Sequence, residues 1–155
     1  MIRKSWWLAL ASIGVAGAAQ AQSCTCQGVG NTRIGTVALI SAKLAGNTVC
    51  VANGATWDWQ EEHLGGSGAT SGQLWDFKRG PGHASDPRSQ VGTWSIAAPP
   101  SNSNNGAITH SYTGGSAYTY RVCQGGAANS VGFCPSVGGA TIMSTVKTGT
   151  GAGCP

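Results

Sequence analysis

The stretch LAGNTVCVANGATWDWQEEHLGGSGATSGQLWDFKRGPGHASDPRSQVGTWSI (residues 44–96) decides the fold of this chain. It contains all five acidic residues of the protein and four of its six tryptophans. From Thr48 onward, apolar side chains recur at every second position, which is the period of a β-strand. Clusters of glycine, serine and proline interrupt this alternation, as turns do. We interpret the stretch as the β-sheet core of one small domain.

The clearest alternation runs over Thr56–Leu64. One face of this predicted strand carries Trp57, Trp59, Glu61 and His63. The glycine-rich segment 65–72 then turns the chain into a second predicted strand, Gln73–Lys78, with Trp75 and Phe77 on one face. We expect the two strands to form an antiparallel hairpin whose aromatic faces pair across it.

The remainder of the chain continues the pattern. A short helix is predicted over Thr36–Ala45, capped by Thr36 and ended by a left-handed turn at Gly46. Further strands are predicted at Thr48–Val51, Val91–Ile96, Ile108–Tyr112, Tyr118–Val122, Val131–Cys134 and Ala140–Lys147. The expected fold is therefore all-β: an antiparallel meander of about seven or eight short strands, arranged as a barrel, half-barrel or sandwich, with one short N-terminal helix.

The first residues have the pattern of a signal peptide rather than of a fold. Two basic residues, Arg3 and Lys4, precede a short apolar run, and small residues at Ala19 and Ala21 suit a signal peptidase. We expect a signal peptide over 1–21 and a single disulfide-stapled domain over 22–155. The apolar run is shorter than a bilayer span, so no membrane span is expected after cleavage. This pattern predicts export to the periplasm or the cell exterior.

The cysteine count supports the same compartment. An even number of cysteines in an exported domain indicates disulfide bonds. The six cysteines after the signal peptide are Cys24, Cys26, Cys50, Cys123, Cys134 and Cys154. A bond between Cys123 and Cys134 across a hairpin is one candidate, but spacing leaves the connectivity open.

The charge balance excludes one class of partner. The chain has a formal net charge of +4, and without Arg3 and Lys4 seven basic and five acidic residues remain, a net charge of +2. The basic residues form no stripe or patch in the sequence, which a nucleic-acid-binding protein would need. We therefore expect no nucleic-acid partner.

The most unusual polar stretch lies between two predicted strands. Lys78, Arg79, His83 and Arg88 share a loop with glycines and prolines, where cationic side chains and backbone N–H groups could bind an anion. Glu61 and His63 end a neighbouring strand and are included in this candidate ligand-binding surface. The alternative interpretation is a solvated loop stiffened by proline, with Asp86 paired to an arginine.

Two other arrangements deserve a test. Glu61, Glu62, His63, His83 and His110 are the residues that could approach a metal ion, but their spacing requires no such site, and we expect neither a metal nor a cofactor. Glu61 and Asp76 could face each other across the predicted hairpin, as the paired carboxylates of glycosidases do. Motifs for a serine nucleophile, a zinc protease or a phosphate loop do not occur in the sequence.

The motif set resembles known exported domains. GNTVC, WDWQEEH, DFKRGPG, VGTWSI and YTYRVC together look like small exported β-domains of bacteria, over roughly Leu44–Cys134. Gly92-Thr93-Trp94 also distantly resembles the Gly-x-Trp element at a strand start in calycin-like domains. In lipocalins that element lies near the N-terminus, whereas here it lies past the middle of the chain. The resemblance implies a barrel that binds a ligand.

These observations lead to one expected function and two alternatives. We expect a secreted or periplasmic domain that binds a small ligand or protein partner without catalysis. The first alternative is a structural or assembly subunit of the cell surface, because a chain rich in Gly, Ser, Thr and Asn and poor in charge pairs sheet edges easily. The second is a small hydrolase.

Overall fold

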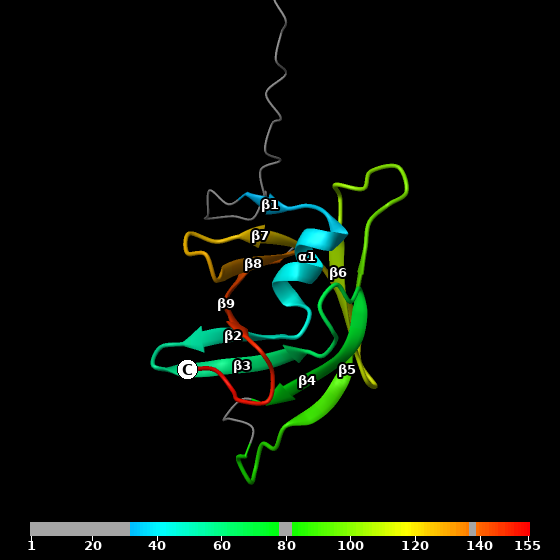
Figure 1. The fold of residues 1–155 in the computed structure, drawn as a ribbon. Coiled ribbons are helices and arrows are strands. Elements are labelled where there is room, and N and C mark those ends of the chain that lie inside the picture. The colour runs from blue at the N-terminus through cyan, green and yellow to red at the C-terminus, as the bar shows by residue number, and fades with distance from the viewer. Residues whose placement is uncertain (1–31, 78–81, 137–138) are drawn as a thin grey trace, which may run out of the picture.

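A computed structural model describes residues 32–77, 82–136 and 139–155 of this chain. Within them the chain forms one helix and nine strands (Figure 1). The elements are β1 (Arg33–Ile34), α1 (Val37–Leu44), β2 (Asn47–Asn53), β3 (Thr56–His63), β4 (Ser71–Phe77), β5 (Ser89–Ala97), β6 (Ala107–Tyr112), β7 (Ala117–Gln124), β8 (Ser130–Pro135) and β9 (Ile142–Thr148). The eight predicted strands and the predicted helix are confirmed, and only the two-residue β1 was missed.

The sheet closes on itself. Consecutive strands from β2 to β9 pair antiparallel, and β9 pairs again with β2, with Val49 opposite Val146. The result is a closed eight-stranded antiparallel barrel with β1 added beside β7. The predicted all-β meander is therefore confirmed, and of the arrangements left open by the sequence the chain adopts the barrel.

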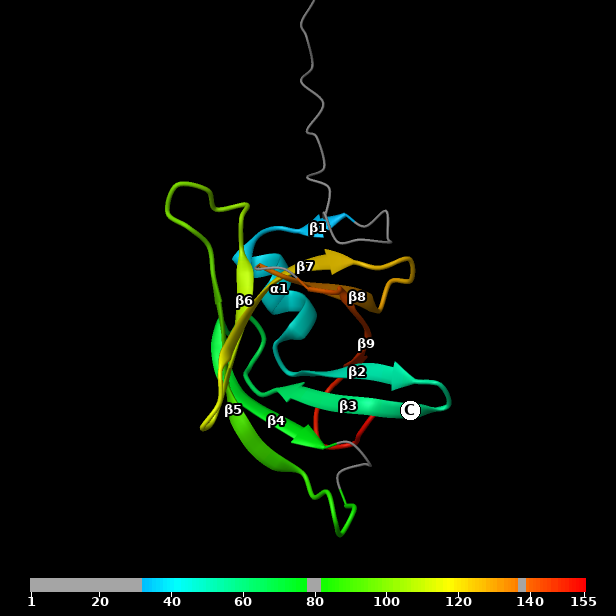
Figure 2. The same cartoon turned by 180° about the vertical axis from the view of Figure 1, so that it is seen from behind.

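The helix fills the barrel from one end. Thr36 caps α1 by accepting a hydrogen bond from the Leu39 N–H at 3.2 Å, and Gly46 ends it with a φ of 74°, as predicted. Ile40 and Leu44 are fully buried against the inward-facing side chains of the strands. In both views of the ribbon the strands surround α1 (Figures 1 and 2). The short helix is thus held by tertiary packing, since eight residues are too few to be stable alone.

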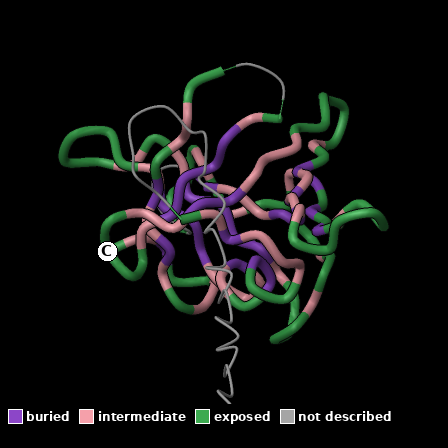
Figure 3. The backbone as a smooth tube through the Cα atoms, turned by 90° about the horizontal axis from the view of Figure 1, so that it is seen from above, coloured by how far each residue is buried: buried purple, intermediate pink, exposed green. Residues whose placement is uncertain are grey.

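The two ends of the barrel differ in character. At the helix end, the inward-facing layer is aliphatic and aromatic, with Val49, Leu74, Ile108, Val122 and Val131 all fully buried. The distal end carries the connections 54–55 and 113–116 and the described parts of two others, 82–88 and 139–141. Buried segments gather at the centre of the molecule and exposed ones in the connections (Figure 3). Space for a functional site is therefore expected in the distal half of the interior, because the helix end is filled by apolar side chains.

One part of the hairpin prediction is wrong. The register of β3 and β4 sets Gln60 opposite Phe77 and Glu62 opposite Trp75, so these two aromatic rings face outward. Trp59 lies on the inner face, opposite Val51 of β2. The aromatic faces of the two strands therefore do not pair. The length of the connection sets this register, and a shift of one residue exchanges the two faces of a strand.

The C-terminal segment covers the outside of β2 and β3. Cys154 is disulfide-bonded to Cys50, and the Cys154 N–H donates to the side-chain oxygen of Gln60 at 2.5 Å. The Gly151 N–H donates to the Glu62 carboxylate. These contacts bury the outward-facing polar side chains of both strands.

The proposed bond between Cys123 and Cys134 does not form. Their Sγ atoms lie 3.6 Å apart, well beyond the roughly 2.05 Å of an S–S bond. Both cysteines are nevertheless disulfide-bonded. Their Cα atoms are offset in the β7–β8 register, where Cys123 faces Gly132 and Cys134 faces Arg121. Cys24 and Cys26 lie outside the described residues.

The packing of α1 makes a testable prediction. Leu44→Ala should lower the free energy of unfolding by about 2–5 kcal/mol, because it leaves a cavity between the helix and the barrel wall. Leu39→Ala on the same helix is the matched control, since Leu39 is 57% exposed and surface changes usually stay within about 0.5 kcal/mol. Guanidinium denaturation of the oxidised protein measures both. Equal losses in the two variants would contradict the packing of α1 inside the barrel.

Candidate functional site

A buried polar cluster lies in the middle of the barrel, between the aliphatic layer and the distal end. It consists of Glu61 and His63 from β3 with His110 and Tyr112 from β6. Alternation along each strand places both members on the inner face. Glu61 is 4% exposed, His110 2%, and His63 has no exposed surface. We call these four residues the interior cluster.

The interior cluster forms a chain of contacts. The Tyr112 hydroxyl donates a hydrogen bond to one carboxylate oxygen of Glu61. The other carboxylate oxygen, Oε2, lies 3.5 Å from His110 Nδ1, too far for a strong hydrogen bond. On its opposite side, the His110 ring contacts His63, with the two Nε2 atoms 3.0 Å apart. His63 Nδ1 has no hydrogen-bond partner among the described residues.

Aromatic rings hold the two imidazoles in place. The His63 ring meets the Trp94 ring edge-on, with 5.7 Å between the ring centroids. The His110 ring packs against Tyr120 at 5.5 Å and against Phe133 at 5.9 Å. Trp94 is itself fixed by a 3.1 Å hydrogen bond from its indole N–H to the carbonyl of Leu64. The rings therefore have little freedom to turn away from each other.

Burial changes the protonation of this cluster. The pKa of Glu61 is raised to about 7, chiefly by burial and also by the charge of Asp76, while the hydrogen bond from Tyr112 opposes the rise. Burial lowers the pKa of His110 to about 4, and burial together with His110 lowers that of His63. Burial and Glu61 raise the pKa of Tyr112 and of Tyr120. At neutral pH both histidines are therefore uncharged, and Glu61 is poised between its two forms.

The interior cluster can take up one proton at Glu61 near neutral pH, and this uptake changes which nitrogen of His110 and of His63 carries the proton. Because both imidazoles are neutral, one Nε2 donates to the other. With Glu61 ionised, His110 points its Nδ1–H at the carboxylate and accepts from His63 at Nε2. With Glu61 protonated, the proton on Oε2 faces His110 Nδ1 across 3.5 Å, which favours the opposite tautomer, with His110 Nε2–H donating to His63. The interior cluster thus presents either a lone pair or an N–H at His63 Nδ1.

A hollow lies at the distal end, next to the interior cluster. Its volume is about 480 Å³, and its lining includes Tyr118, Tyr120, Pro135 and Ile142. The registers Ile108–Tyr120, His110–Tyr118 and Tyr120–Pro135 place these side chains on the inner face of the barrel. Tyr118 is 50% exposed and meets Tyr112 edge-on at 6.0 Å. We call this hollow the mouth; the Tyr120 ring separates it from His110.

The residues of the predicted binding surface do not lie together. Glu61 and His63 are inside the barrel. Arg88 lies outside, where its Nε donates to Glu62 at 2.6 Å and its guanidinium stacks over Trp75 at 4.4 Å. His83 is exposed and accepts hydrogen bonds from Ser85. Lys78 and Arg79 lie outside the described residues. The barrel wall therefore separates the members of this surface that the structure describes.

The two carboxylates predicted to face each other do so. Glu61 of β3 is directly opposite Asp76 of β4. The five residues considered for a metal are dispersed, however, and the described part of the chain contains no group of three or more His, Cys, Asp or Glu residues able to hold an ion. None of its helices has the length and hydrophobicity to cross a membrane.

Sequence reasoning identified Glu61 and His63 as site residues but missed His110, Tyr112 and the mouth as parts of the same site. It considered His110 only as a possible metal ligand, and it placed Tyr112, Tyr118 and Tyr120 in predicted strands without assigning them to a site. A usable signal was present, because His110 and Tyr112 alternate on one face of a predicted strand, as Glu61 and His63 do on another. Which two faces meet depends on how the sheet closes, and the alternation alone does not contain that information.

In comparisons with known proteins, no family model, curated protein or solved structure matches the chain.

The raised pKa of Glu61 has a measurable consequence. In the folded protein Glu61 keeps its proton between about pH 4.5 and 7, whereas in the unfolded chain it has lost it. The proton that Glu61 keeps stabilises the folded state. This contribution to the unfolding free energy is complete below pH 4.5 and is lost as the pH rises through 7. Glu61→Gln stays neutral, so its unfolding free energy relative to the parent should increase by about 1.4 kcal/mol per pH unit across that window. Urea denaturation across the window measures this difference.

The two histidines also make the stability depend on pH, so the unfolding free energies of Glu61→Gln and the parent are subtracted at each pH. Their lowered pKa values stabilise the folded state above pH 6.5, and this contribution is lost as the pH falls toward 4. Because the parent and Glu61→Gln both contain these histidines, the histidine contribution cancels in the difference between their unfolding free energies. Tyr112→Phe removes the hydrogen bond that lowers the pKa of Glu61 and should move the window upward. A pH-independent difference between Glu61→Gln and the parent would contradict the assignment.

Proposed function

We propose that this protein is an exported, non-catalytic binding barrel of calycin-like architecture that holds a small uncharged ring compound in its mouth. The observation that carries the proposal is the mouth itself, a hollow of about 480 Å³ at one end of a closed barrel, lined by inward-facing Tyr118, Tyr120, Pro135 and Ile142 and edged by Ala117, Thr119 and Ser136. Ligand pockets typically have volumes of roughly 300–1,000 Å³ and combine apolar and aromatic walls with a few polar groups. The lining of the mouth has this composition.

The chemistry of the walls favours a ring. Tyrosine faces pack against flat or cyclic ligands, and their hydroxyl groups bond the polar edge. Tyr118 stands half exposed at the rim and Tyr120 lies deeper, against His110. Among the described residues that line the mouth, none is acidic or basic. An uncharged phenol or sugar ring fits this lining better than a charged ligand does.

Barrel closure also bears on the two alternatives. Assembly through sheet edges needs unpaired strands, and every strand of the eight-stranded ring has a partner on both sides. Hydrolysis by Glu61 and Asp76 needs both carboxylates to touch a substrate, but Glu61 is almost fully buried and already engaged by Tyr112. Binding is therefore the better-supported function.

The compartment is part of the proposal. Disulfide bonds persist in oxidising compartments and are rare in the cytosol. The Cys50–Cys154 bond and the bonded state of Cys123 and Cys134 fit a protein that works in the periplasm or outside the cell. Together with the expected signal peptide over 1–21, these bonds support export.

Ligand-observed NMR tests the proposal, with phenol and methyl glucoside as the two probes. We expect saturation transfer from the oxidised protein to at least one probe, and the better probe distinguishes an aromatic ring from a sugar. Tyr118→Ala should weaken binding about three- to tenfold, because it removes one aromatic contact.

Met143→Ala is the matched control, since Met143 is also partly exposed but neighbours inward-facing Ile142 on β9 and so faces outward. Its affinity for the probe should stay within about twofold of the parent, as for surface changes away from a site. Absence of saturation transfer to both probes, or equal effects of Tyr118→Ala and Met143→Ala, would overturn the proposal.

A further inference from the structure

The C-terminal segment, residues 149–155, lies on the outer face of the barrel and is tied there by one covalent bond. It follows β9 directly and is drawn in red in Figure 1. A disulfide bond joins Cys154 of this segment to Cys50 of β2. The segment therefore leaves the sheet at one strand of the closing seam and is fastened to the other.

Hydrogen bonds fix the start of the C-terminal segment. The Thr48 hydroxyl group donates to the Gly149 carbonyl at 2.7 Å. The Gly149 N–H donates to the side-chain oxygen of Asn47 at 3.0 Å. Further along, Lys147 of β9 donates to the Gly153 carbonyl. The contacts at Gly149 continue the pairing of β9 with β2, so the first residue of the segment belongs to the barrel wall.

The rest of the segment covers two polar side chains on the outer face of β3. The Gly151 N–H donates to the Glu62 carboxylate. The Cys154 N–H donates to the side-chain oxygen of Gln60. Glu62 has no exposed surface and Gln60 is 2% exposed, whereas Arg88 supplies the other contact of Glu62. Removal of the segment would return Gln60 and one side of Glu62 to water.

The non-covalent contacts of the segment are too few to hold it in place alone. Ala152 and Pro155 are exposed, so the segment buries little apolar surface. Gly151 has a φ of 86°, and glycine loses more conformational freedom on ordering than any other residue. A few surface hydrogen bonds do not offset the entropy that the ordered residues lose. The Cys50–Cys154 bond is therefore the contact that keeps the segment on the sheet.

The two sulfur atoms of this bond differ in access to solvent. Cys50 is 1% exposed, whereas Cys154 is partly exposed. Among the described residues the other disulfide-bonded cysteines are Cys123 and Cys134, which are 0% and 5% exposed. Thiol–disulfide exchange depends on which sulfur atom a thiolate can reach. A reductant therefore reaches the Cys154 sulfur before the others.

We propose that the C-terminal segment is a redox-controlled cover, which a dithiol releases by reducing the Cys50–Cys154 bond. A thiolate of the dithiol attacks the Cys154 sulfur, the S–S bond breaks, and its electron pair leaves on the Cys50 sulfur, which takes up a proton. The second thiol of the dithiol then attacks its own sulfur in the mixed disulfide and releases Cys154 as a thiol. Two electrons and two protons thus pass to the cysteines, and the dithiol becomes an intramolecular disulfide.

Release of the cover leaves the barrel closed. The pairing of β2 with β9 runs from Asn47 opposite Thr148 to Cys50 opposite Thr145 and does not use the segment. Among the described residues that line the mouth, none belongs to the segment. The redox state then decides whether the outer face of β2 and β3 is covered, independently of what the mouth binds.

Amide hydrogen exchange by NMR tests the proposal on the oxidised protein, before and after treatment with dithiothreitol. The Gly151 N–H should exchange about tenfold or more faster after reduction, because its hydrogen bond to Glu62 opens with the segment. The Leu64 N–H is the internal control, since it donates to the Gln73 carbonyl at 3.0 Å within the barrel. Its exchange rate should change by less than about twofold.

Alkylation and peptide mass mapping follow the order of reduction. Cys50 and Cys154 should be labelled before Cys123 and Cys134, because Cys154 is the accessible member of the set. Labelling of Cys123 and Cys134 first would contradict the assignment of the Cys50–Cys154 bond as the redox-sensitive one.

Three variants separate release of the segment from a general loss of stability. The double variant Cys50→Ser with Cys154→Ser should show fast exchange of the Gly151 N–H without any reductant. Gly151→Ala keeps the disulfide but places a side chain at a left-handed φ, so dithiothreitol should reduce the bond about fivefold or more faster. Gly54→Ala is the matched control. Gly54 also has a positive φ, 61°, and open space at its Cβ, but it lies in the turn between β2 and β3.

The outcomes decide between a releasable cover and a purely structural bond. Fast exchange at Gly151 with slow exchange at Leu64, in the reduced parent and in the double variant, supports the proposal. If the double variant fails to fold by circular dichroism, the reduced parent decides, because it carries no substitution. Unchanged protection of Gly151 after complete reduction would overturn the proposal. Equal acceleration at Gly151 and Leu64, or equal rates of reduction in Gly151→Ala and Gly54→Ala, would do so as well.

Discussion

The antiparallel pairing of β9 with β2 is the contact on which the rest of the structure depends. It joins the last strand to the first strand of the meander, with Val49 opposite Val146, and turns an open sheet into a barrel. Closure gives every strand of the ring two neighbours and encloses an interior that side chains must fill. The Cys50–Cys154 bond ties the segment after β9 to β2 and so supports the same seam covalently. Without closure, neither the interior cluster nor the mouth would exist.

The interior is filled in two different ways. At the helix end, Ile40 and Leu44 of α1 complete an apolar layer that supplies most of the hydrophobic stabilisation. In the middle, the same barrel buries a carboxyl group and two imidazoles, which costs free energy unless each finds a partner. Tyr112, Glu61, His110 and His63 provide partners for one another, and neutral imidazoles with a protonated carboxyl group remove most of the buried charge. A core selected for stability alone would be apolar here, whereas this barrel places a polar layer next to the mouth.

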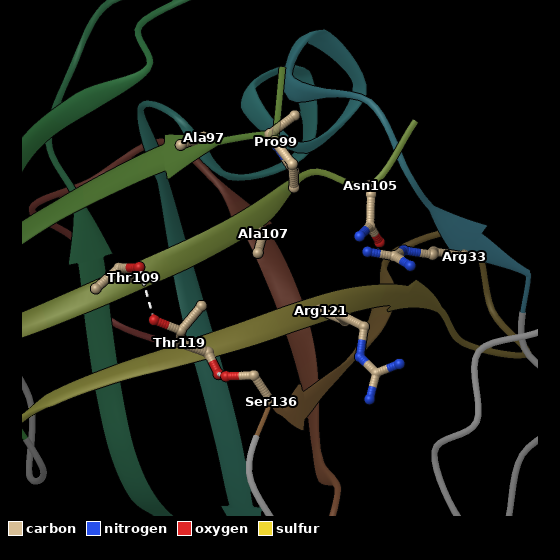
Figure 4. A pocket seen from close by; sticks show the side chains of 10 residues that line it. Arg33, Ala97, Pro99, Asn105, Ala107, Thr109, Thr119, Arg121 and Ser136 are labelled. Carbon is tan, nitrogen blue, oxygen red and sulfur yellow. Dashed lines mark hydrogen bonds between the residues drawn. The ribbon is translucent and has the colours of Figure 1, made fainter. Parts of the chain in front are cut away.

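Strand β7 lines two hollows because its side chains alternate. Tyr118 and Tyr120 face inward and line the mouth, whereas Arg121 faces outward and lines a second hollow on the outer face of the barrel (Figure 4). Thr119 lies at the edge of both hollows. Arg88 neutralises Glu62, a carboxylate with no exposed surface that the C-terminal segment covers. Local sequence indicated that cationic side chains seek an anion, but only the fold shows that the partner of Arg88 is Glu62.

By itself, the sequence determined the local structure. Apolar residues at every second position, turn residues between them and the Thr36 cap specify the strands and α1, because these features depend on neighbours in the chain. The same alternation placed Glu61 and His63 on one face and Glu61 opposite Asp76. Tertiary structure alone decided that Trp75 faces outward, that Cys123 does not bond Cys134, and that Arg33 lies near Arg121. The reason is physical: registers across long connections and the meeting of distant strands depend on the closure of the whole sheet, which short-range sequence patterns do not encode.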